Sequence, residues 1–371
     1  WCSGCVNGGT VILCQDCEDI GACSSCLNYD LENEDQDISF YCPSCFKKQK
    51  GNEPYPFKLA CKTSIRENWP VINTERLAIV SIHLQGMQDT PGRITLEILQ
   101  PWLKGNLVFF DVEFNLLNEV TSAGFWDAME TLLNDLEKEL EDFQRFLIIF
   151  TTHCNPTNGY VHHVPDNGGA VPINEASVDR FTDRFQKILT RANNNSNVLV
   201  LLSCGALLQT EESKNYLQVF AKEKKLFSKI IGFTQTHFQP FFSSRFLMDL
   251  STQHFIFNRP TLKAVLQDHQ GLGAHTDVVE ITALTTTTFI WVHQSRRPFG
   301  HVYQHQCPVC SRLSTDGPKF KNSDCVYFKC SFSECDGISI FQLPAGARWL
   351  YNGPPIKGDS RGTWLHIIKT T

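Results

Sequence analysis

The sequence lacks any apolar run long enough to cross a membrane, and it is poor in charge. The longest apolar runs, such as Phe146–Phe150 and Val198–Leu202, have the length of buried strands. Only 19% of the 371 residues are charged, with a formal net charge of -6. This excludes a disordered or collagen-like chain and predicts a globular protein with no membrane partner. Because the chain begins with Trp1 rather than Met, we expect it to be a fragment of a longer protein.

Cysteine is nearly absent from the middle of the chain. Of sixteen cysteines, eight lie in residues 1–45 and five in residues 307–335, which leaves Cys61, Cys154 and Cys204 between them. A secreted fold held by disulfides distributes its cysteines along a short chain. The clustering therefore predicts metal sites at both ends of an intracellular protein.

The first 45 residues repeat a spacing that is typical of zinc ligands. Two thiolates separated by two residues bind one zinc ion from a tight turn, and a tetrahedral zinc needs two such pairs. Four pairs predict two Zn2+ ions, which would supply most of the folding free energy of so short a segment. Free or disulfide-bonded cysteines are the weaker interpretation. The pairs are Cys2 with Cys5, Cys14 with Cys17, Cys23 with Cys26, and Cys42 with Cys45.

The surroundings of these pairs match one zinc-finger family. Gly8–Cys17 is a glycine turn and short strand that lead into a cysteine pair, and Phe40–Cys45 is an aromatic closing segment. The five residues between Cys17 and Cys23 are more than a RING finger usually has. On these features residues 1–50 resemble a PHD-type finger, in particular the all-cysteine PHD part of ADD-type modules.

The resemblance implies cross-braced ligation, a nuclear location and the binding of a histone amino-terminal tail. In the cross-brace, the first and third cysteine pairs hold one zinc ion, and the second and fourth pairs hold the other. The implied sets are Cys2, Cys5, Cys23 and Cys26, and Cys14, Cys17, Cys42 and Cys45.

The same segment is acidic, with eight carboxylates against three lysines in the first 50 residues. An acidic surface beside an exposed strand suits a basic extended peptide that adds as an extra strand. We therefore predict a histone tail or another basic peptide as partner, bound by Asp16, Glu18 and Asp19. The acidic run 30–37 is interpreted as a solvated loop. A nucleic acid is not expected as the main ligand, because it requires a positive surface.

The pattern changes after the finger. Residues 51–75 are polar and interrupted by prolines, which predicts a linker. Over residues 76–255, apolar runs alternate with amphipathic segments, which predicts an α/β fold with a mainly parallel sheet and helices on both faces. The predicted strands are 77–82, 107–112, 146–151, 198–202 and 229–233. The predicted helices are 95–103, 122–143, 175–192 and 240–249.

Two chemically active residues follow successive predicted strands. His153 follows strand 146–151, and Cys204 follows strand 198–202. Active sites of parallel sheets lie at the carboxyl ends of strands, so these side chains converge if the strands are neighbours. A cysteine thiolate is then a nucleophile, and a histidine accepts its proton and later protonates the leaving amine. Gly205 permits a tight turn whose backbone N–H groups can hold an oxyanion.

Several short motifs of this region match one peptidase family. They are the histidine strand Phe150–His153, the hairpin residues Gly159–Val161 and Asp166–Gly169, and the cysteine strand Asn197–Gly205. On these motifs residues 76–255 resemble the caspase-like cysteine peptidases, with the CHAT-type branch nearest. The resemblance implies a caspase-like fold and endopeptidase activity on a protein substrate.

The resemblance also assigns roles: Cys204 as nucleophile, and His153 as general base and acid. One position departs from the pattern, because the family usually has glycine directly after the histidine and this chain has Cys154. The alternative is therefore a catalytically inactive caspase-like protein that acts as a chromatin adaptor or reader. His162 and His163 are interpreted as surface residues of the hairpin.

Residues 256–371 are predicted to form a β-rich extension, with strands at 277–284 and 285–293. A zinc-ribbon-like site is expected within residues 301–345, where two cysteine pairs can hold a third Zn2+. Four thiolates leave no open metal position, so this zinc is predicted to be structural. The predicted ligands are Cys307, Cys310, Cys330 and Cys335, with the pairing of Cys325 and Cys330 as the alternative.

Overall fold

The structure of the protein is a computed structural model, and the chain divides into two compact units, Trp1–Ile72 and Asn73–Thr371. The structure describes residues 2, 10–18, 20–28, 39–57, 72–87, 89–117, 119–165, 169–172, 185–190, 196–259, 261–313, 317–350 and 362–370. Cys5, Asp19, the acidic run 30–37, residues 58–71 of the predicted linker and most of the predicted helix 175–192 lie outside them.

The first unit is a small cysteine-rich finger. The buried side chains of its described residues are mainly cysteines, joined by Ala22, Leu27 and Phe40. This described part therefore has few apolar side chains with which to form a core. Its elements are β1 (Val11–Leu13), β2 (Gly21–Cys23), α1 (Ser24–Leu27) and α2 (Pro43–Lys50), with β1 and β2 antiparallel.

Two aromatic residues of the predicted linker pack on this finger. The Tyr55 hydroxyl donates a hydrogen bond to the Tyr41 carbonyl at 2.7 Å, and its ring lies edge-on to Phe46 with centroids 5.1 Å apart. The Phe57 ring contacts the fully buried Phe40, with centroids 5.6 Å apart. The finger therefore extends past the boundary that we predicted at residue 50.

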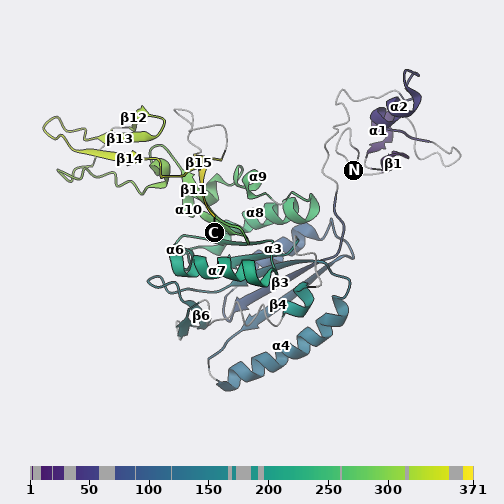
Figure 1. Ribbon diagram of the computed structural model, residues 1–371, viewed down its shortest axis with the longest axis horizontal. Helices are drawn as coiled ribbons and strands as arrows, with labels where there is room; N and C mark the ends of the chain where they lie inside the picture. The colour runs from purple at the N-terminus through teal and green to yellow at the C-terminus, as the bar shows by residue number, and fades with distance from the viewer. Residues whose placement is uncertain are drawn as a thin grey trace. The chain divides into compact units, whose positions relative to one another are not determined.

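The second unit is organised around one nine-stranded sheet (Figure 1). Its parallel strands are β3 (Leu77–Leu84), β4 (Leu107–Phe114), β5 (Arg145–Thr151), β8 (Val198–Leu202) and β9 (Lys229–Phe233). Its antiparallel strands are β10 (Val278–Ile281), β11 (Thr285–Val292), β15 (Arg348–Trp349) and β16 (Thr363–Thr370). The spatial order is β15-β16-β11-β10-β9-β8-β5-β3-β4.

Continuous burial explains why the parallel strands are visible in the sequence. Every residue of β3, β5, β8 and β9 is buried, so each strand is a nearly unbroken apolar run. The strands β8 and β9 occupy the predicted residues. Helix α3 (Thr90–Leu99) starts five residues before the predicted one, because Pro91 lies in its first turn, where its fixed φ favours a helix start.

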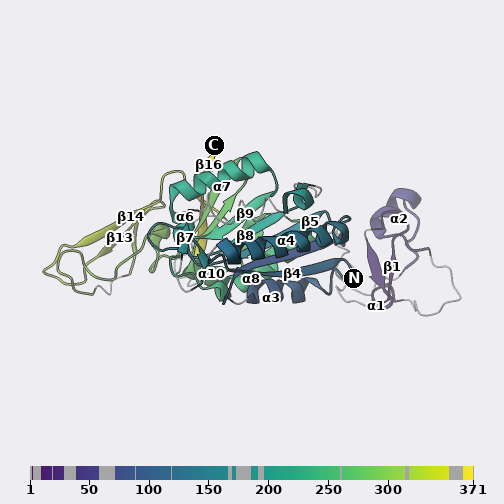
Figure 2. The same cartoon turned by 90° about the horizontal axis from the view of Figure 1, so that it is seen from below.

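Helices cover both faces of the sheet, as predicted. One face packs against α4 (Glu119–Glu139), α7 (Glu211–Lys224) and the helical residues 185–190. The other face contacts α8 (Pro240–Ser251), whose Phe246 ring lies edge-on to Phe233 of β9. Figure 2 shows α7 and α8 on opposite sides of the sheet.

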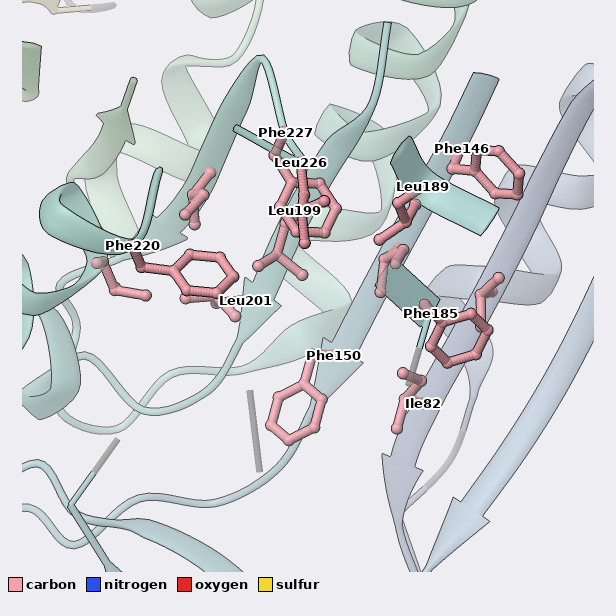
Figure 3. Packing of buried hydrophobic residues seen from close by; sticks show 14 of the residues in the cluster. Ile82, Phe146, Phe150, Phe185, Leu189, Leu199, Leu201, Phe220, Leu226 and Phe227 are labelled. Carbon is pink, nitrogen blue, oxygen red and sulfur yellow. The ribbon is translucent and has the colours of Figure 1, made fainter. Parts of the chain in front are cut away.

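The larger core lies under α4 and α7. Figure 3 shows its aromatic and aliphatic side chains. Among them are Phe146 of β5, Leu199 of β8, and Phe185 of the helical residues 185–190. All three are at most 1% exposed. A core of this size stabilises the sheet without help from a metal ion.

The β-rich extension is joined to the same sheet. Strand β10 pairs with β9, and β11 pairs with β10 and β16. The boundary that we predicted at residue 255 falls inside η1 (Thr252–Ile256), within one compact unit. The remaining short elements at this end of the sheet are α6 (Ala206–Gln209), α9 (Leu262–Leu266), α10 (Gln270–His275) and η2 (Pro298–Gly300).

Two small sheets complete the unit. The hairpin β6 (Val161–Val164) and β7 (Gly169–Val171) follows β5, and the three-stranded ribbon consists of β12 (Lys319–Asn322), β13 (Cys325–Lys329) and β14 (Ile338–Gln342). The ribbon packs through Val326 and Phe328 against Leu365 of β16. Among the described residues, no helix combines the length and apolar character that crossing a membrane requires.

Candidate active site and metal centres

Strand pairing brings His153 and Cys204 to one edge of the sheet. Strands β5 and β8 are parallel neighbours, with Thr151 opposite Leu202. His153 and Cys204 each lie two residues beyond these partners. The sequence did not show whether these two strands are neighbours, and the structure shows that they are. The two residues therefore lie side by side at the carboxyl ends of adjacent strands.

The two side chains shift each other's pKa. The neighbouring side chains of Cys154 and His153 lower the pKa of Cys204 from 9.0 to about 4. The contact with Cys204 in turn raises the pKa of His153 above 6.5. Both shifts favour the thiolate and the imidazolium, the forms in which a cysteine is nucleophilic and a histidine can donate a proton. His153 is exposed and Cys204 is partly exposed, so both are open to a ligand.

Gly205 is required for space rather than for an unusual backbone angle. A Cβ at this position would lie 1.8 Å from the carbonyl carbon of Thr234. The Gly205 N–H donates a hydrogen bond to the Gln235 carbonyl at 2.6 Å. The amide that we expected to hold an oxyanion is therefore already bonded, and Gly205 serves the close approach of two chain segments.

Cys154 contacts Cys204 in two ways. Its thiol donates a hydrogen bond to the Cys204 carbonyl oxygen, 2.6 Å from the sulfur, and its backbone N–H points at the Cys204 sulfur. The contact with Cys204, and burial, raise the pKa of the Cys154 thiol and favour its protonated form. The sequence marked Cys154 as a departure from the family pattern but did not indicate this contact.

His162 differs from its predicted surface position. It is only 6% exposed, and its ring lies perpendicular to the His153 ring with centroids 6.4 Å apart. Its backbone N–H donates to the His153 carbonyl at 2.9 Å. Burial lowers the pKa of His162, so the ring is neutral beside the imidazolium. His162 thus supports the segment that carries His153.

A cleft of about 460 Å3 adjoins the same sheet edge. Its walls include Thr234 and Gln235, the two residues against which Gly205 packs, and an ion pair. In that pair Arg297 donates to both carboxylate oxygens of Asp277, at 2.5 and 2.6 Å. Sequence reasoning missed this cleft, because Asp277 and Arg297 are not part of any local motif.

In the finger, seven of the predicted zinc ligands lie in two groups. The second and fourth pairs form a tetrad, and Cys2 joins the third pair in a triad, with Cys5 outside the described residues. Within each group the sulfurs lie within 4.8 Å of one another. This alternation of pairs is the cross-brace that the resemblance implied. The tetrad is Cys14, Cys17, Cys42 and Cys45, and the triad is Cys2, Cys23 and Cys26.

The tetrad is prepared for a cation. Burial opposes ionisation of Cys14, but the N–H groups of Cys17, Cys42 and Asp16 overcome it and lower the pKa of Cys14 to about 7. The Cys42 N–H donates to the Cys14 sulfur at 3.2 Å, and the Cys45 N–H donates to the Cys42 sulfur at 3.4 Å. Amides that point at sulfur stabilise thiolates, which are the form that binds zinc.

The ribbon gathers the four cysteines that we predicted: Cys307, Cys310, Cys330 and Cys335. The Cys307 and Cys335 sulfurs are 3.6 Å apart, and those of Cys310 and Cys330 are 3.7 Å apart. A tetrahedral zinc with bonds of about 2.3 Å separates its sulfurs by about 3.8 Å, so the spacing fits the ion.

Local chemistry supports this second tetrad. A Cβ on Gly337 would lie 2.4 Å from the Cys307 sulfur, so only glycine leaves room for the sulfur there. The amides of Cys310 and Val309 lower the pKa of Cys307 to about 6. Cys325 lies on β13 outside the tetrad, so the alternative pairing of Cys325 with Cys330 is wrong.

The predicted peptide-binding residues lie near an open strand edge. In the described part of the finger β1 pairs only with β2, and Leu13 is 54% exposed. Asp16 and Glu18 are exposed just after β1. Asp16 also lies beside Cys45 and raises the pKa of its thiol, so this carboxylate is close to the metal ligands.

A comparison with protein-family models found no match, and a search of the curated proteins found none either. The assignments below therefore depend on the motifs and geometry of this chain.

Proposed function

We propose that the protein is a cysteine endopeptidase that acts through the Cys204–His153 pair. One observation carries the proposal: paired strands place both residues at equal offsets beyond β8 and β5, where each shifts the pKa of the other toward the thiolate and the imidazolium. An ion pair at an exposed sheet edge would add little to the stability of the fold, because solvent screens the two charges. A structural role therefore explains these two residues less well than a catalytic one. We assign part of the substrate peptide to the cleft that Gln235 lines, which lies beyond Gly205 at the same sheet edge.

The residues divide the chemistry as follows. The Cys204 thiolate attacks the carbonyl carbon of a peptide bond, and the His153 imidazolium protonates the leaving amine. Water then releases the acyl group, with His153 as the base. We assign the oxyanion to the Cys154 N–H, which already points at the Cys204 sulfur, rather than to the bonded Gly205 amide.

A thiol-directed electrophile tests this proposal. We expect it to label Cys204 preferentially, and we expect the Cys204→Ala variant to lose both this label and all cleavage of a fluorogenic peptide library. Cys325→Ala, which removes a buried cysteine outside every cluster, is the matched control and should cleave as wild type does. Equal cleavage by wild type and Cys204→Ala would refute the peptidase proposal.

The second candidate is an inactive adaptor with the same fold. Two observations favour it: the bonded Gly205 amide, and the buried Cys154 side chain where the family usually has glycine. Under this proposal Cys204 is labelled by the electrophile, but neither histones nor the peptide library are cut. Labelling without turnover therefore separates the adaptor from the enzyme.

We propose further that the finger binds a basic extended peptide, such as a histone amino-terminal tail, and locates the protein in the nucleus. The unpaired edge of β1 in the described finger offers backbone groups to an added strand, and Asp16 and Glu18 offer charge for lysine or arginine. The bound zinc ions would hold this edge in place, whereas the four-thiolate ribbon site would be structural.

Titration of a full-length sample with an unmodified histone-tail peptide tests the finger. Asp16→Asn with Glu18→Gln should weaken binding by about tenfold, because two charge contacts are lost. Glu53→Gln is the matched control, since Glu53 is an exposed carboxylate of the same unit beyond α2. Undetectable wild-type binding at millimolar peptide, with zinc present, would refute the reader proposal.

A further inference from the structure

Cys154 and Cys204 form an unusual pair within the described residues of the sheet unit. The other described cysteines of this unit are ribbon ligands or, in the case of Cys325, lie alone on β13. Cys154 is 4% exposed and belongs to the large core, against which Cys204 also packs. Cys204 itself is partly exposed at the sheet edge. One thiol therefore meets solvent while the second is held behind it.

The backbone fixes both residues. Cys154 forms a bridge with Val161, and the Thr152 N–H donates to the Leu202 carbonyl at 3.2 Å, which ties the two segments together. The Cys154 sulfur lies 2.6 Å from the carbonyl oxygen of Cys204. A disulfide requires neighbouring side chains rather than a large backbone movement, and this contact makes the two cysteines neighbours.

We propose that Cys204 is a site of reversible oxidation by a hydroperoxide, and that Cys154 resolves the oxidised sulfur as an intramolecular Cys154–Cys204 disulfide. The inference concerns thiol chemistry alone, so it holds whether or not Cys204 also cleaves peptides. It gives a purpose to the cysteine that stands where the resembled family usually has glycine.

The chemistry balances in two steps. In the first, the Cys204 thiolate attacks one oxygen of hydrogen peroxide; the S–O bond forms, the O–O bond breaks, and the leaving hydroxide takes a proton from the His153 imidazolium to give water. In the second, the Cys154 sulfur attacks the sulfenic sulfur; the S–S bond forms, the S–O bond breaks, and hydroxide leaves with the Cys154 proton as a second water. Two thiols are oxidised, and one peroxide is reduced.

Burial of Cys154 directs the outcome. Without a second thiol, an oxidised cysteine proceeds to sulfinic and sulfonic acids, which thiol reductants do not reverse. Because Cys154 is behind Cys204 and shielded from solvent, peroxide reaches Cys204 first and the resolving thiol is retained. The disulfide would remove the nucleophile until a thiol reductant restores it.

Peptide mapping of the full chain after treatment with hydrogen peroxide tests the proposal. Trypsin releases the two cysteines on separate peptides, residues 146–180 and residues 192–214, each with a single cysteine. We expect a non-reduced sample to contain these two peptides linked, and dithiothreitol to separate them and restore alkylation of Cys204. No linked peptide, together with a Cys204 sulfenic acid that dimedone traps, would overturn the proposal.

Variants add a second, independent reading. After peroxide and then dithiothreitol, the Cys154→Ser variant should recover at least about tenfold less alkylatable Cys204 than wild type, because its sulfur proceeds to sulfinic acid. Cys325→Ser is the matched control and should recover as wild type does. Equal recovery in Cys154→Ser and wild type would also overturn the proposal. If Cys154→Ser does not fold, the wild-type peptide map decides alone.

Discussion

The finger and the sheet unit use cysteine in opposite ways. Among the described residues of the finger, most of the buried side chains are cysteines, joined by Ala22, Leu27 and Phe40. In the sheet unit, aliphatic and aromatic side chains form the large core, and the one buried cysteine among the described residues of that core is Cys154. The difference teaches that a fold which does not need its thiols for stability can place them at a reactive edge.

The ribbon combines both strategies. Its four cysteines form a tetrad like that of the finger, but Val326 and Phe328 also pack onto the apolar surface of the large sheet. Metal loss is therefore expected to loosen the ribbon knuckles while the strands stay attached. The following predictions test how far the contrast between finger and sheet extends.

Zinc removal should have the largest effect, and it should be confined to the cysteine clusters. Structural zinc contributes roughly 10–16 kcal/mol of apparent binding free energy, which is folding free energy in a unit with little core. A strong chelator should therefore collapse the dispersed NMR signals of residues 10–57 and leave the thermal transition of the sheet unit in place. Cys14→Ser should lose zinc, and Cys325→Ser should retain it. If the dispersed finger signals survive chelation, the finger does not depend on zinc, and its stability does not differ in origin from that of the sheet unit.

The converse change is a cavity in the core of the sheet. Phe146 is fully buried in β5, so Phe146→Ala should destabilise the sheet unit by about 3–5 kcal/mol. Zinc content and finger signals should not change. Phe241→Ala is the matched control, because Phe241 is 77% exposed on the same unit and its loss should cost little. Chemical denaturation, followed by the fluorescence of the sheet unit, measures the free energy of unfolding of both variants. Equal losses in Phe146→Ala and Phe241→Ala would show that the buried core does not determine the stability of the unit.

The pH dependence of alkylation separates the edge thiol from ordinary ones. A pKa lowered to about 4 keeps Cys204 ionised at every pH above it. Its iodoacetamide rate should therefore change by less than about twofold between pH 5.5 and 7.5, whereas an unperturbed thiol gains about 100-fold. His153→Ala should make the rate steeply pH-dependent, because the stabilising imidazolium is gone, while His305→Ala on the ribbon should not. A steep wild-type profile would contradict the ionic pair.

The smallest predicted effect concerns the aromatic residues that follow α2. Tyr55→Phe removes the hydroxyl that bonds to the Tyr41 carbonyl and should destabilise the zinc-loaded finger by about 1 kcal/mol. Tyr160→Phe, at a 36% exposed tyrosine of the sheet unit, should leave the finger unchanged. The midpoint of urea unfolding, followed by finger signals, gives the measurement. An unchanged midpoint in Tyr55→Phe would show that Tyr55 does not stabilise the finger and belongs to the linker.

Where information is local, sequence reasoning reached the structure. The cysteine spacings Cys14–Cys17 and Cys307–Cys310 are set by tight turns, so they predict ligand pairs without a tertiary model. Strand β8 is an unbroken apolar run and β9 is apolar after Lys229, and both were placed residue for residue. By contrast, β16 was not predicted, because its burial does not alternate and its partner β11 lies about 80 residues earlier.

By itself, the sequence determined the metal-ligand pairs, the alternation that gives a mainly parallel sheet, and the positions of His153 and Cys204 after their strands. Only the tertiary structure decided that β5 and β8 are neighbours, that Gly205 faces Thr234, and that Cys154 touches Cys204. The physical reason is the range of the interactions. Spacing and hydrophobic period act between residues a few positions apart, whereas strand order and side-chain contacts depend on packing between segments about 50 residues apart.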